Sequence, residues 1–354
     1  MDQHAPAKYS VVRADLGRDR EQILALWTRH LSKGGYEERR YEWGNRENPF
    51  ANGRRWLLLA DGAVVGTAGM VIRRFKIDDC IVLAGRAGGF GVDREHRFLG
   101  PALMLQRAVL DDLGRDGLEL IYSSSPADVI GIFTRLGYER VGDLARYVKI
   151  LDVEPYLRRR MPASAAAWLA APLNVGLDVV SRTTWRPCFP IEIRGFDDRF
   201  DDLWTRAAPH YGITTERTSR FLSWRFDKSS HPQAFKTVGV TAPGTDRLVG
   251  YAIYQMDHAH ASVADLFAED TDTALEMVLA SVTRWVGCLG AASITVRCLA
   301  SGMLSQVLER AGFRRRPDDK ATSVVVSPRA SGQRERGPGW KARWYFLGAD
   351  DFWQ

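Results

Sequence analysis

One sequence pattern occurs twice along this chain of 354 residues. Each copy has a tryptophan, then a proline, an apolar segment, a short turn and an apolar pair that ends in glycine. These landmarks are Trp43, Pro49 and Gly66 in the first copy and Trp224, Pro232 and Gly250 in the second. The same landmarks in the same order, at nearly equal spacing, indicate that one folding unit has been duplicated.

A second match supports the duplication. Each half contains a short helical pattern that ends in a glycine followed by an aromatic residue, at Gly137-Tyr138 and at Gly312-Phe313. Glycine directly after a helix permits the left-handed backbone that closes many helix ends. We therefore expect a helix to stop, and a strand to follow, at the same point of each half.

The coarse pattern of each half alternates strands and helices. In the first half it predicts a helix at 20–31, a hairpin at 56–74, a strand at 82–92, a helix at 101–113, a strand at 118–122, a helix at 127–136 and a strand at 147–151. The predicted fold is mixed α/β (α+β), with two tandem domains that are each a mixed, mostly antiparallel sheet flanked by helices. The expected boundaries are 1–152, a helical linker at 153–190, and 191–354.

The turn after the predicted strand at 82–92 suits an anion. It contains Val92, Arg97, Phe98, Leu99, Gly100, Pro101 and Ala102. Free backbone N–H groups at the positive end of a helix dipole bind phosphate readily, and Gly100 allows close approach. Arg97 adds positive charge, and Pro101 is expected at the first helical position, where its missing N–H costs nothing.

This turn resembles the Arg/Gln-x-x-Gly-x-Gly/Ala signature of the GNAT acetyltransferase superfamily, which grips the pyrophosphate of coenzyme A. The resemblance covers residues 10–150 well and 191–325 more faintly. It implies that Val92 and residues 97–102 bind acetyl-CoA or another acyl-CoA as co-substrate, and that the first domain is a GNAT domain with the acyl-CoA site.

Two residues depart from the family pattern. Pro101 removes one backbone donor that would face a phosphate oxygen. Phe133 stands where many family members carry the tyrosine that protonates the departing thiolate, and a phenyl ring donates no proton. The resemblance therefore supports binding of acyl-CoA better than it supports a particular general acid.

The corresponding stretch of the second half has no glycine turn. Glu269, Asp270 and Asp272 stand there instead, and their charges would repel a pyrophosphate. We expect a GNAT-like second domain with a degenerate donor site that helps to shape the acceptor site.

Acyl transfer to an amine requires a proton route to the leaving sulfur. In the family this lies where the strands at 86–92 and 118–125 splay apart, which implies Tyr122 and Ser123 as catalytic candidates. Proximity alone is an alternative source of rate enhancement.

Five residues at matching places in the two halves are candidates for binding the acceptor, although packing and turn formation are the more ordinary roles for them: Trp43, Asn48, Trp224, Arg225 and His231. Arg86, near the splayed strand ends, and Asp265 complete the predicted substrate-binding residues. Asp265 lies in an apolar strand and needs a partner, for which an acceptor amine or Arg225 would serve.

Neither metal nor disulfide chemistry is indicated. The four cysteines form no Cys-x-x-Cys pair, and His258 and His260 have no evident third ligand. The net charge of +6 does not by itself identify a binding partner. We expect a small-molecule amine as acceptor, and neither DNA nor tRNA.

The first ten residues lack the apolar core of a secretory signal, so a cytoplasmic location is expected. The weakly polar run at 163–180 contains too many interruptions for a membrane span. Three arginines at 158–160 precede it, so segment 157–180 either touches a membrane surface peripherally or covers apolar surface as a linker.

Three functions remain open. Tandem GNAT-like chains with these landmarks resemble enzymes that modify amino sugars of cell-surface polysaccharides, which implies an acyl-CoA-dependent N-acyltransferase acting on an amino sugar, with acetyl-CoA as donor. The second is a Fem-like aminoacyl transferase, against which the pyrophosphate turn argues. The third is a non-catalytic module that binds acyl-CoA or serves as a scaffold.

Overall fold

The computed structural model describes residues 8–31, 35–182, 190–228, 235–317, 321–328 and 337–351, with side chains omitted for 175–182. These residues form two compact units. Unit 1 holds the chain up to Gly142, together with Lys228, residues 322–328 and Gly337. Unit 2 holds the remainder from Asp143 onward. Each unit is described separately below.

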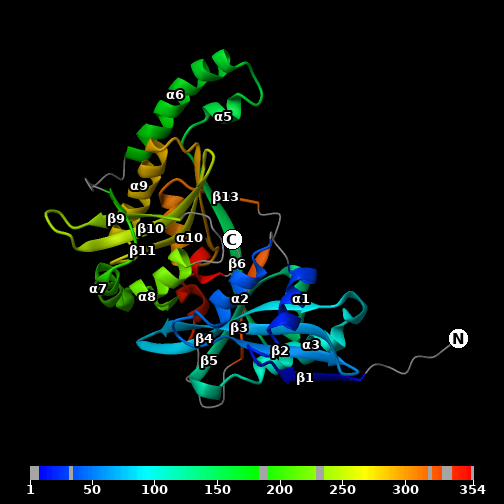
Figure 1. The fold of residues 1–354 in the computed structure, drawn as a ribbon. Helices are drawn as coiled ribbons and strands as arrows, with labels where there is room; N and C mark the ends of the chain where they lie inside the picture. Colours follow the sequence, from blue (N-terminus) through cyan, green and yellow to red (C-terminus); the bar gives the residue numbers. More distant parts are fainter. Residues whose placement is uncertain are drawn as a thin grey trace. The chain divides into compact units, whose positions relative to one another are not determined.

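Unit 1 is a mixed sheet with helices on both faces (Figure 1). Its strands lie in the order β1-β2-β3-β4-β5-β14, and β4–β5 is the parallel pair among antiparallel neighbours. The strands are β1 (Tyr9–Arg13), β2 (Arg54–Ala60), β3 (Ala63–Ile77), β4 (Cys80–Val92), β5 (Leu118–Pro126) and β14 (Thr322–Val326). The helices are α1 (Arg20–His30), α2 (Glu37–Asn45), α3 (Leu99–Leu110) and α4 (Ala127–Arg135).

The two faces of the unit 1 sheet have separate cores. One core, which includes Trp56, Leu58 and Met70, packs against Leu105 and Val109 of α3 and against α4. The other packs Leu57 against Trp27 of α1 and Tyr41 of α2. Neighbouring residues of β2 thus point to opposite faces, as the two-residue period of a strand requires.

Unit 2 repeats this arrangement. Its strands lie in the order β7-β9-β10-β11-β12-β6, with β11–β12 as the parallel pair. The strands are β6 (Glu139–Ile150), β7 (Pro190–Ile193), β8 (Ile213–Thr215), β9 (Lys236–Thr241), β10 (Leu248–Asp257), β11 (His260–Ala268), β12 (Ser293–Leu299) and β13 (Arg314–Arg316). The helices are α5 (Glu154–Leu157), α6 (Ala163–Arg182), α7 (Asp198–Ala207), α8 (Ser219–Leu222), a π-helix (Ser223–Asp227), α9 (Thr273–Cys288) and α10 (Met303–Arg310).

The two halves of the sequence exchange a strand. β14 comes from the second half of the chain but pairs with β5 of unit 1. β6 follows the first half, yet from Leu144 onward it pairs with β12 of unit 2 and also with β13. The mixed α/β class and the mostly antiparallel sheets predicted from the sequence are confirmed, whereas this exchange was not predicted.

The helix ends at Gly137 and Gly312 match in detail. Both glycines have φ of +84°. Tyr138 N–H bonds to the Phe133 carbonyl at 3.1 Å, and Phe313 N–H bonds to the Leu308 carbonyl at 2.9 Å. This is the hydrogen-bond pattern in which a left-handed glycine closes a helix.

The segment expected to be a helical linker contains α5 and α6. Helix α6 buries Ala166 and Ala170, while Trp168 is 75% exposed and Leu173 52%. Within the described ranges, no helix is both long and apolar enough to cross a membrane. Contact of this segment with a membrane surface stays a prediction.

Candidate functional site

The central feature of unit 1 is the divergence of β4 and β5. Their parallel pairing extends from Leu83 with Leu118 to Arg86 with Tyr122. Beyond this point β5 pairs with β14, and β4 continues along β3 to Val92. The two strands therefore separate where the family resemblance places acyl transfer.

A bulge shapes β4 just beyond the divergence. The register against β3 shifts between Thr67 and Gly69, where Gly88 to Gly91 of β4 faces the shorter stretch of β3. Gly89 has φ of +64°, and a Cβ atom there would lie 2.4 Å from Nη1 of Arg55. Such a bulge removes residues from regular pairing and redirects the strand. Because these glycines have no Cβ atom, neighbouring side chains can approach the backbone of this segment closely.

The strand β4 leads into the N-terminus of α3. Helix α3 begins at Leu99 with no side-chain cap, and Phe98, Leu99 and Gly100 are exposed. Pro101 is the third residue of the helix, so its expected position at the first was wrong. It still lies in the first turn, where backbone N–H groups have no partner within the helix. Pro101 and Ala102 are buried, and the exposed end of the turn presents the positive pole of the helix.

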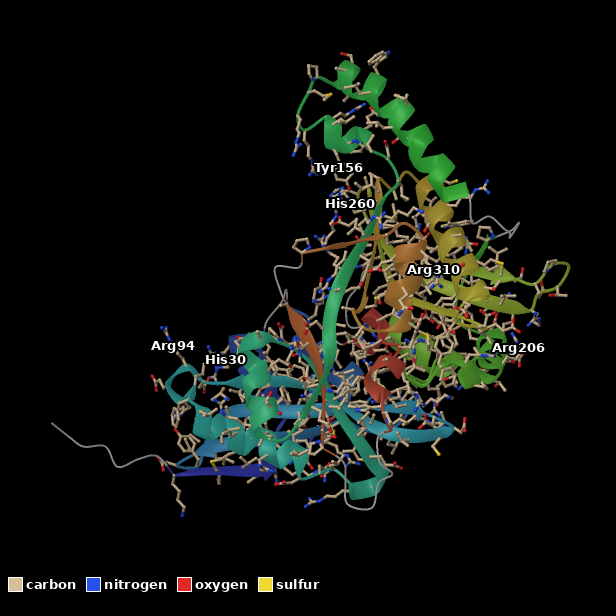
Figure 2. The ribbon with its side chains drawn as sticks, turned by 180° about the vertical axis from the view of Figure 1, so that it is seen from behind. His30, Arg94, Tyr156, Arg206, His260 and Arg310 are labelled. Carbon is tan, nitrogen blue, oxygen red and sulfur yellow. The ribbon has the colours of Figure 1, made fainter. Side chains whose placement is uncertain are left out.

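The side chain of Arg97 is exposed but tethered. Its Nε donates to the Val92 carbonyl at 2.7 Å, and its Nη2 donates to Nδ1 of His30 at 2.7 Å. Because a guanidinium only donates, Nε2 of His30 is the donor to Asp93 at 2.6 Å. Figure 2 shows His30 and Arg94 at the same end of unit 1. This network holds a cation beside the uncapped helix end.

The two catalytic candidates lie on opposite faces of β5. Tyr122 is fully buried, and its hydroxyl accepts from Nη1 of Arg73 at 3.2 Å. Ser123 is buried on the other face, where its Oγ lies 2.9 Å from that of Ser125. Ser123 also donates weakly to the Ala87 carbonyl at 3.5 Å. Both residues lie at the divergence of β4 and β5, and their predicted roles in proton transfer stay predictions.

Phe133 belongs to the core in the structure. It is 3% exposed, and its ring meets the Tyr138 ring edge-on with centroids 5.0 Å apart. Burial raises the pKa of the Tyr138 hydroxyl. The ring of Phe133 thus completes the apolar contact that accompanies the helix end at Gly137.

Three buried arginines converge beside the bulge, and the sequence reasoning identified only one of them. Arg86 donates to the Ala87 carbonyl at 2.8 Å and to Oγ of Ser124 at 2.9 Å. Arg55 donates from Nε to Oδ1 of Asn45 at 2.8 Å and from Nη1 to the Gly88 carbonyl at 3.1 Å. The guanidinium carbons of Arg40 and Arg55 lie 4.9 and 4.8 Å from the centroid of the Trp27 ring. The available signal for Arg55 was its position directly before the apolar run that begins at Trp56.

The charges of this cluster repel one another. Burial, followed by the Arg55 and Arg86 charges, lowers the pKa of Arg40 to about 8, against a smaller opposing effect of Glu37. Burial is also the first cause that lowers the pKa of Arg55 to about 10, with Arg86 contributing. The environment therefore disfavours the cationic forms of Arg40 and Arg55.

The other predicted substrate-binding residues of unit 1 are buried in the fold. Trp43 is 2% exposed within α2. Asn48 donates to the Ile72 carbonyl at 2.7 Å, and its Oδ1 accepts from Phe50 N–H at 3.0 Å. These contacts are those of a residue that fixes a turn.

In unit 2, Asp265 has a different partner from the one proposed. It is fully buried and forms an ion pair with Arg217, not with Arg225, at 3.2 Å. Tyr251 donates to its Oδ2 at 2.9 Å, and Asp350 lies 2.9 Å from Arg217. Burial raises the pKa of Asp265, although Arg217 opposes this. Arg217 is the cation that balances Asp265 within the core, and it also pairs with Asp350 of the C-terminal segment (residues 337–351), which bonds to Thr215 of β8.

Arg225 and Trp224 lie in the π-helix and are buried. Arg225 donates to the carbonyl groups of Gly348, Ala349 and Asp351 at 3.2–3.3 Å. It thereby holds the C-terminal segment. His231 lies outside the described residues.

The divergence of β11 and β12 in unit 2 is filled by the chain itself. Their parallel pairing ends at Val263 with Val296. Beyond it, Leu299 N–H bonds to the Phe346 carbonyl, Leu347 bridges to Cys298, and the Tyr345 hydroxyl bonds to the Leu266 carbonyl. At the start of α9, Asp270 accepts from Asp272 N–H and Ala274 N–H at 2.9 and 3.0 Å. In unit 2, protein groups thus occupy both the strand divergence and the start of the helix that follows it.

No group of three His, Cys, Asp or Glu side chains suited to a metal ion is found in the described ranges. His260 lies 2.8 Å from Oγ of Ser293, and His258 is 95% exposed at a hairpin turn.

The comparisons with known proteins identify the fold. A GCN5-related N-acetyltransferase from Anabaena variabilis superposes with a TM-score of 0.64 and 11% identity, over 90% of this chain and 72% of its own. A GCN5-related N-acetyltransferase from Kribbella flavida superposes with a TM-score of 0.59 and 15% identity, over 90% of this chain and 71% of its own. The Saccharomyces cerevisiae N-myristoyltransferase with bound myristoyl-CoA superposes with a TM-score of 0.54 and 9% identity, over 90% of this chain and 82% of its own. The chain thus has the fold of the GCN5-related N-acetyltransferases. No family model matches the sequence, and no curated protein does.

Proposed function

We propose that this protein is an acyl-CoA-dependent N-acyltransferase whose donor site lies in unit 1. The observation that carries the proposal is the divergence of β4 and β5 at Arg86 and Tyr122, which leads to the uncapped N-terminus of α3 beside Arg97. Val92 and residues 97–102 would hold the pyrophosphate, and the thioester would lie along the bulge at Gly88 and Gly89. Acetyl-CoA is the proposed donor.

The reaction would proceed by direct transfer. A neutral amine attacks the thioester carbonyl carbon and the C–S bond breaks. The nitrogen gives up one proton as the amide forms, and this loss balances the proton that the departing CoA thiolate takes up. Backbone groups of the bulge would polarise the carbonyl, because fixed dipoles in a buried site need no reorganisation. Tyr122 and Ser123 are the proposed proton donors.

Unit 2 would act without a CoA of its own. Its strand divergence contains residues 345–347. Asp270 accepts hydrogen bonds from backbone N–H groups at the start of α9, which a phosphate would need as donors. We propose a small amine as the acceptor, with an amino sugar as one class. The Fem-like alternative requires a tRNA ligand, and the non-catalytic alternative requires acyl-CoA binding without turnover.

The proposal is tested by incubating the purified chain with acetyl-CoA and a panel of amines that includes amino sugars, and measuring free CoA. We expect release of CoA that depends on the amine and yields an N-acetyl product by mass spectrometry. Binding of acetyl-CoA without release by any amine would favour the non-catalytic module.

A further inference from the structure

Helix α6 has an apolar side that the fold leaves exposed. Trp168 is 75% exposed, Leu173 52% and Leu169 38%. Successive residues of an α-helix are rotated by about 100°, so these three side chains share one side of the helix. Ala166 and Ala170 are buried on the adjoining side. The helix thus turns small side chains toward the protein and its large apolar side chains toward solvent.

This exposed side belongs to a helical hairpin that is fixed to the rest of unit 2. Asn174 of α6 accepts from Val153 N–H at 3.0 Å and donates to Asp152 at 2.8 Å, at the start of α5. The ring of Tyr156 in α5 meets the ring of His260 in β11, with centroids 6.5 Å apart (Figure 2). The exposure of the apolar side is therefore a property of a packed element and not of a loose chain end.

Three exposed arginines connect α5 to α6. Arg158 pairs with Glu154 at 2.6 Å, and the guanidinium carbon of Arg159 lies 5.9 Å from the centroid of the Tyr156 ring. The sequence has no charged residue between Arg160 and Asp178. Positive charge therefore gathers at one end of the apolar side of α6, and the apolar side itself carries no acidic group that would oppose an anionic surface.

We propose that α6 and the arginine run at 158–160 dock on the surface of a bilayer that contains anionic lipids. A helix with apolar side chains next to basic ones lies at the boundary between headgroups and acyl chains. Trp168, Leu169 and Leu173 would enter this boundary, where an indole ring is well suited to the mixed environment. The arginines would lie among the lipid phosphates. The pair of Arg158 with Glu154 is exposed and weak, so a lipid phosphate can compete with it.

A second copy of the chain fits this surface less well. If two copies met through the same side of α6, both arginine runs would come together and repel each other. The apolar side extends over about three turns of one helix, which is small beside the roughly 1,000 Å² that a stable protein interface buries. Anionic lipids supply the opposite charge and an apolar phase together, and for this reason we assign the surface to a bilayer.

The test measures sedimentation of the full chain with vesicles of phosphatidylcholine alone and of equal parts phosphatidylcholine and phosphatidylglycerol. We expect the chain to sediment with the anionic vesicles and the bound fraction to fall as salt is raised, because salt screens the arginines. The neutral vesicles should bind it much more weakly. Absence of binding to the anionic vesicles would overturn the proposal.

The apolar contribution is tested with matched double variants. Trp168→Ser combined with Leu173→Ser removes two exposed apolar side chains from α6. Leu289→Ser combined with Ile81→Ser removes two that are exposed elsewhere. All four side chains are exposed, so the melting temperatures should stay close to that of wild type. We expect the α6 variant to lower the vesicle partition coefficient about tenfold or more, and the control to leave it nearly unchanged.

The basic contribution needs a control for net charge, because the whole chain carries +6. Replacing the three arginines at 158–160 by glutamine is compared with the same replacement at 314–316, a second run of three exposed arginines. Both triple variants lose three positive charges. We expect the first to lower partitioning about tenfold or more and the second to have a smaller effect. Equal losses in the two triple variants would mean that net charge drives binding, and would overturn the proposal.

Self-association is the competing outcome. Sedimentation velocity over a range of protein concentrations would detect it. A dimer that Trp168→Ser combined with Leu173→Ser abolishes, without vesicle binding by wild type, would assign the surface to a second copy. Membrane contact and acyl transfer are independent of each other, since the α6 variants should keep the wild-type response to CoA whether or not the vesicles bind.

Discussion

Tyr122 and Ser123 illustrate what single residues in a sequence can and cannot indicate. Their position beside the strand divergence followed from the family resemblance, and the structure places both there. Their surroundings did not follow, because alternate residues of a strand face opposite ways and meet different neighbours. Tyr122 meets Arg73, and Ser123 meets Ser125. Asp265 shows the same limit, since its partner Arg217 is distant in sequence.

Tyr122→Phe and Ser123→Ala separate the two proton routes. If one of these hydroxyl groups delivers the proton to the leaving thiolate, its removal should lower kcat about tenfold to a thousandfold with little change in CoA affinity. The measurement is steady-state CoA release together with CoA titration of each variant. Unchanged kcat in both would leave proximity, or a residue outside this pair, as the source of catalysis.

The helices and strands were predicted where local chemistry decides them. Helix α4 and the glycine at its end follow from the apolar spacing and from Gly137, and α10 repeats them. The pairing of β14 and β6 was not predictable in this way. A two-residue alternation identifies a strand, but nothing local to β14 specifies β5 as its partner. Helix α2 was missed because its sequence is mostly polar, so its stability depends on tertiary packing, to which buried Tyr41 and Trp43 contribute.

Replacing Gly137 by alanine should destabilise the protein by about 1 kcal/mol, because a Cβ atom is disfavoured at a φ of +84°. Gly287→Ala is the matched control. Gly287 lies inside α9, where the new methyl group would meet Leu151 at 3.8 Å, so alanine should stabilise the helix by about 0.5–1 kcal/mol. Chemical denaturation of both variants checks the opposite signs. If Gly137→Ala had the same free energy of unfolding as wild type, the helix end would tolerate another backbone conformation.

For the molecule as a whole, the two units share one architecture but differ at the equivalent site. In unit 1 the parallel strands diverge beside glycines, an uncapped helix and exposed Arg97. In unit 2 the C-terminal segment and Asp270 occupy the corresponding positions. The acidic residues of the second half led us to expect a degenerate donor site there. The sequence did not indicate that residues 345–347 would fill the strand divergence of unit 2. This difference supports the proposal that the acyl-CoA site lies in unit 1.

The most direct test of this assignment is the thermal unfolding of the full chain with CoA or acetyl-CoA. A ligand that binds the native state at a concentration about a hundredfold above Kd adds about 2.7 kcal/mol of stability. Wild type should show a rise in Tm that saturates with CoA. Arg97→Glu should lose it, whereas Glu269→Lys, which changes the equivalent turn of unit 2, should retain it. A rise that survives Arg97→Glu and disappears in Glu269→Lys would place the site in unit 2 and contradict the account.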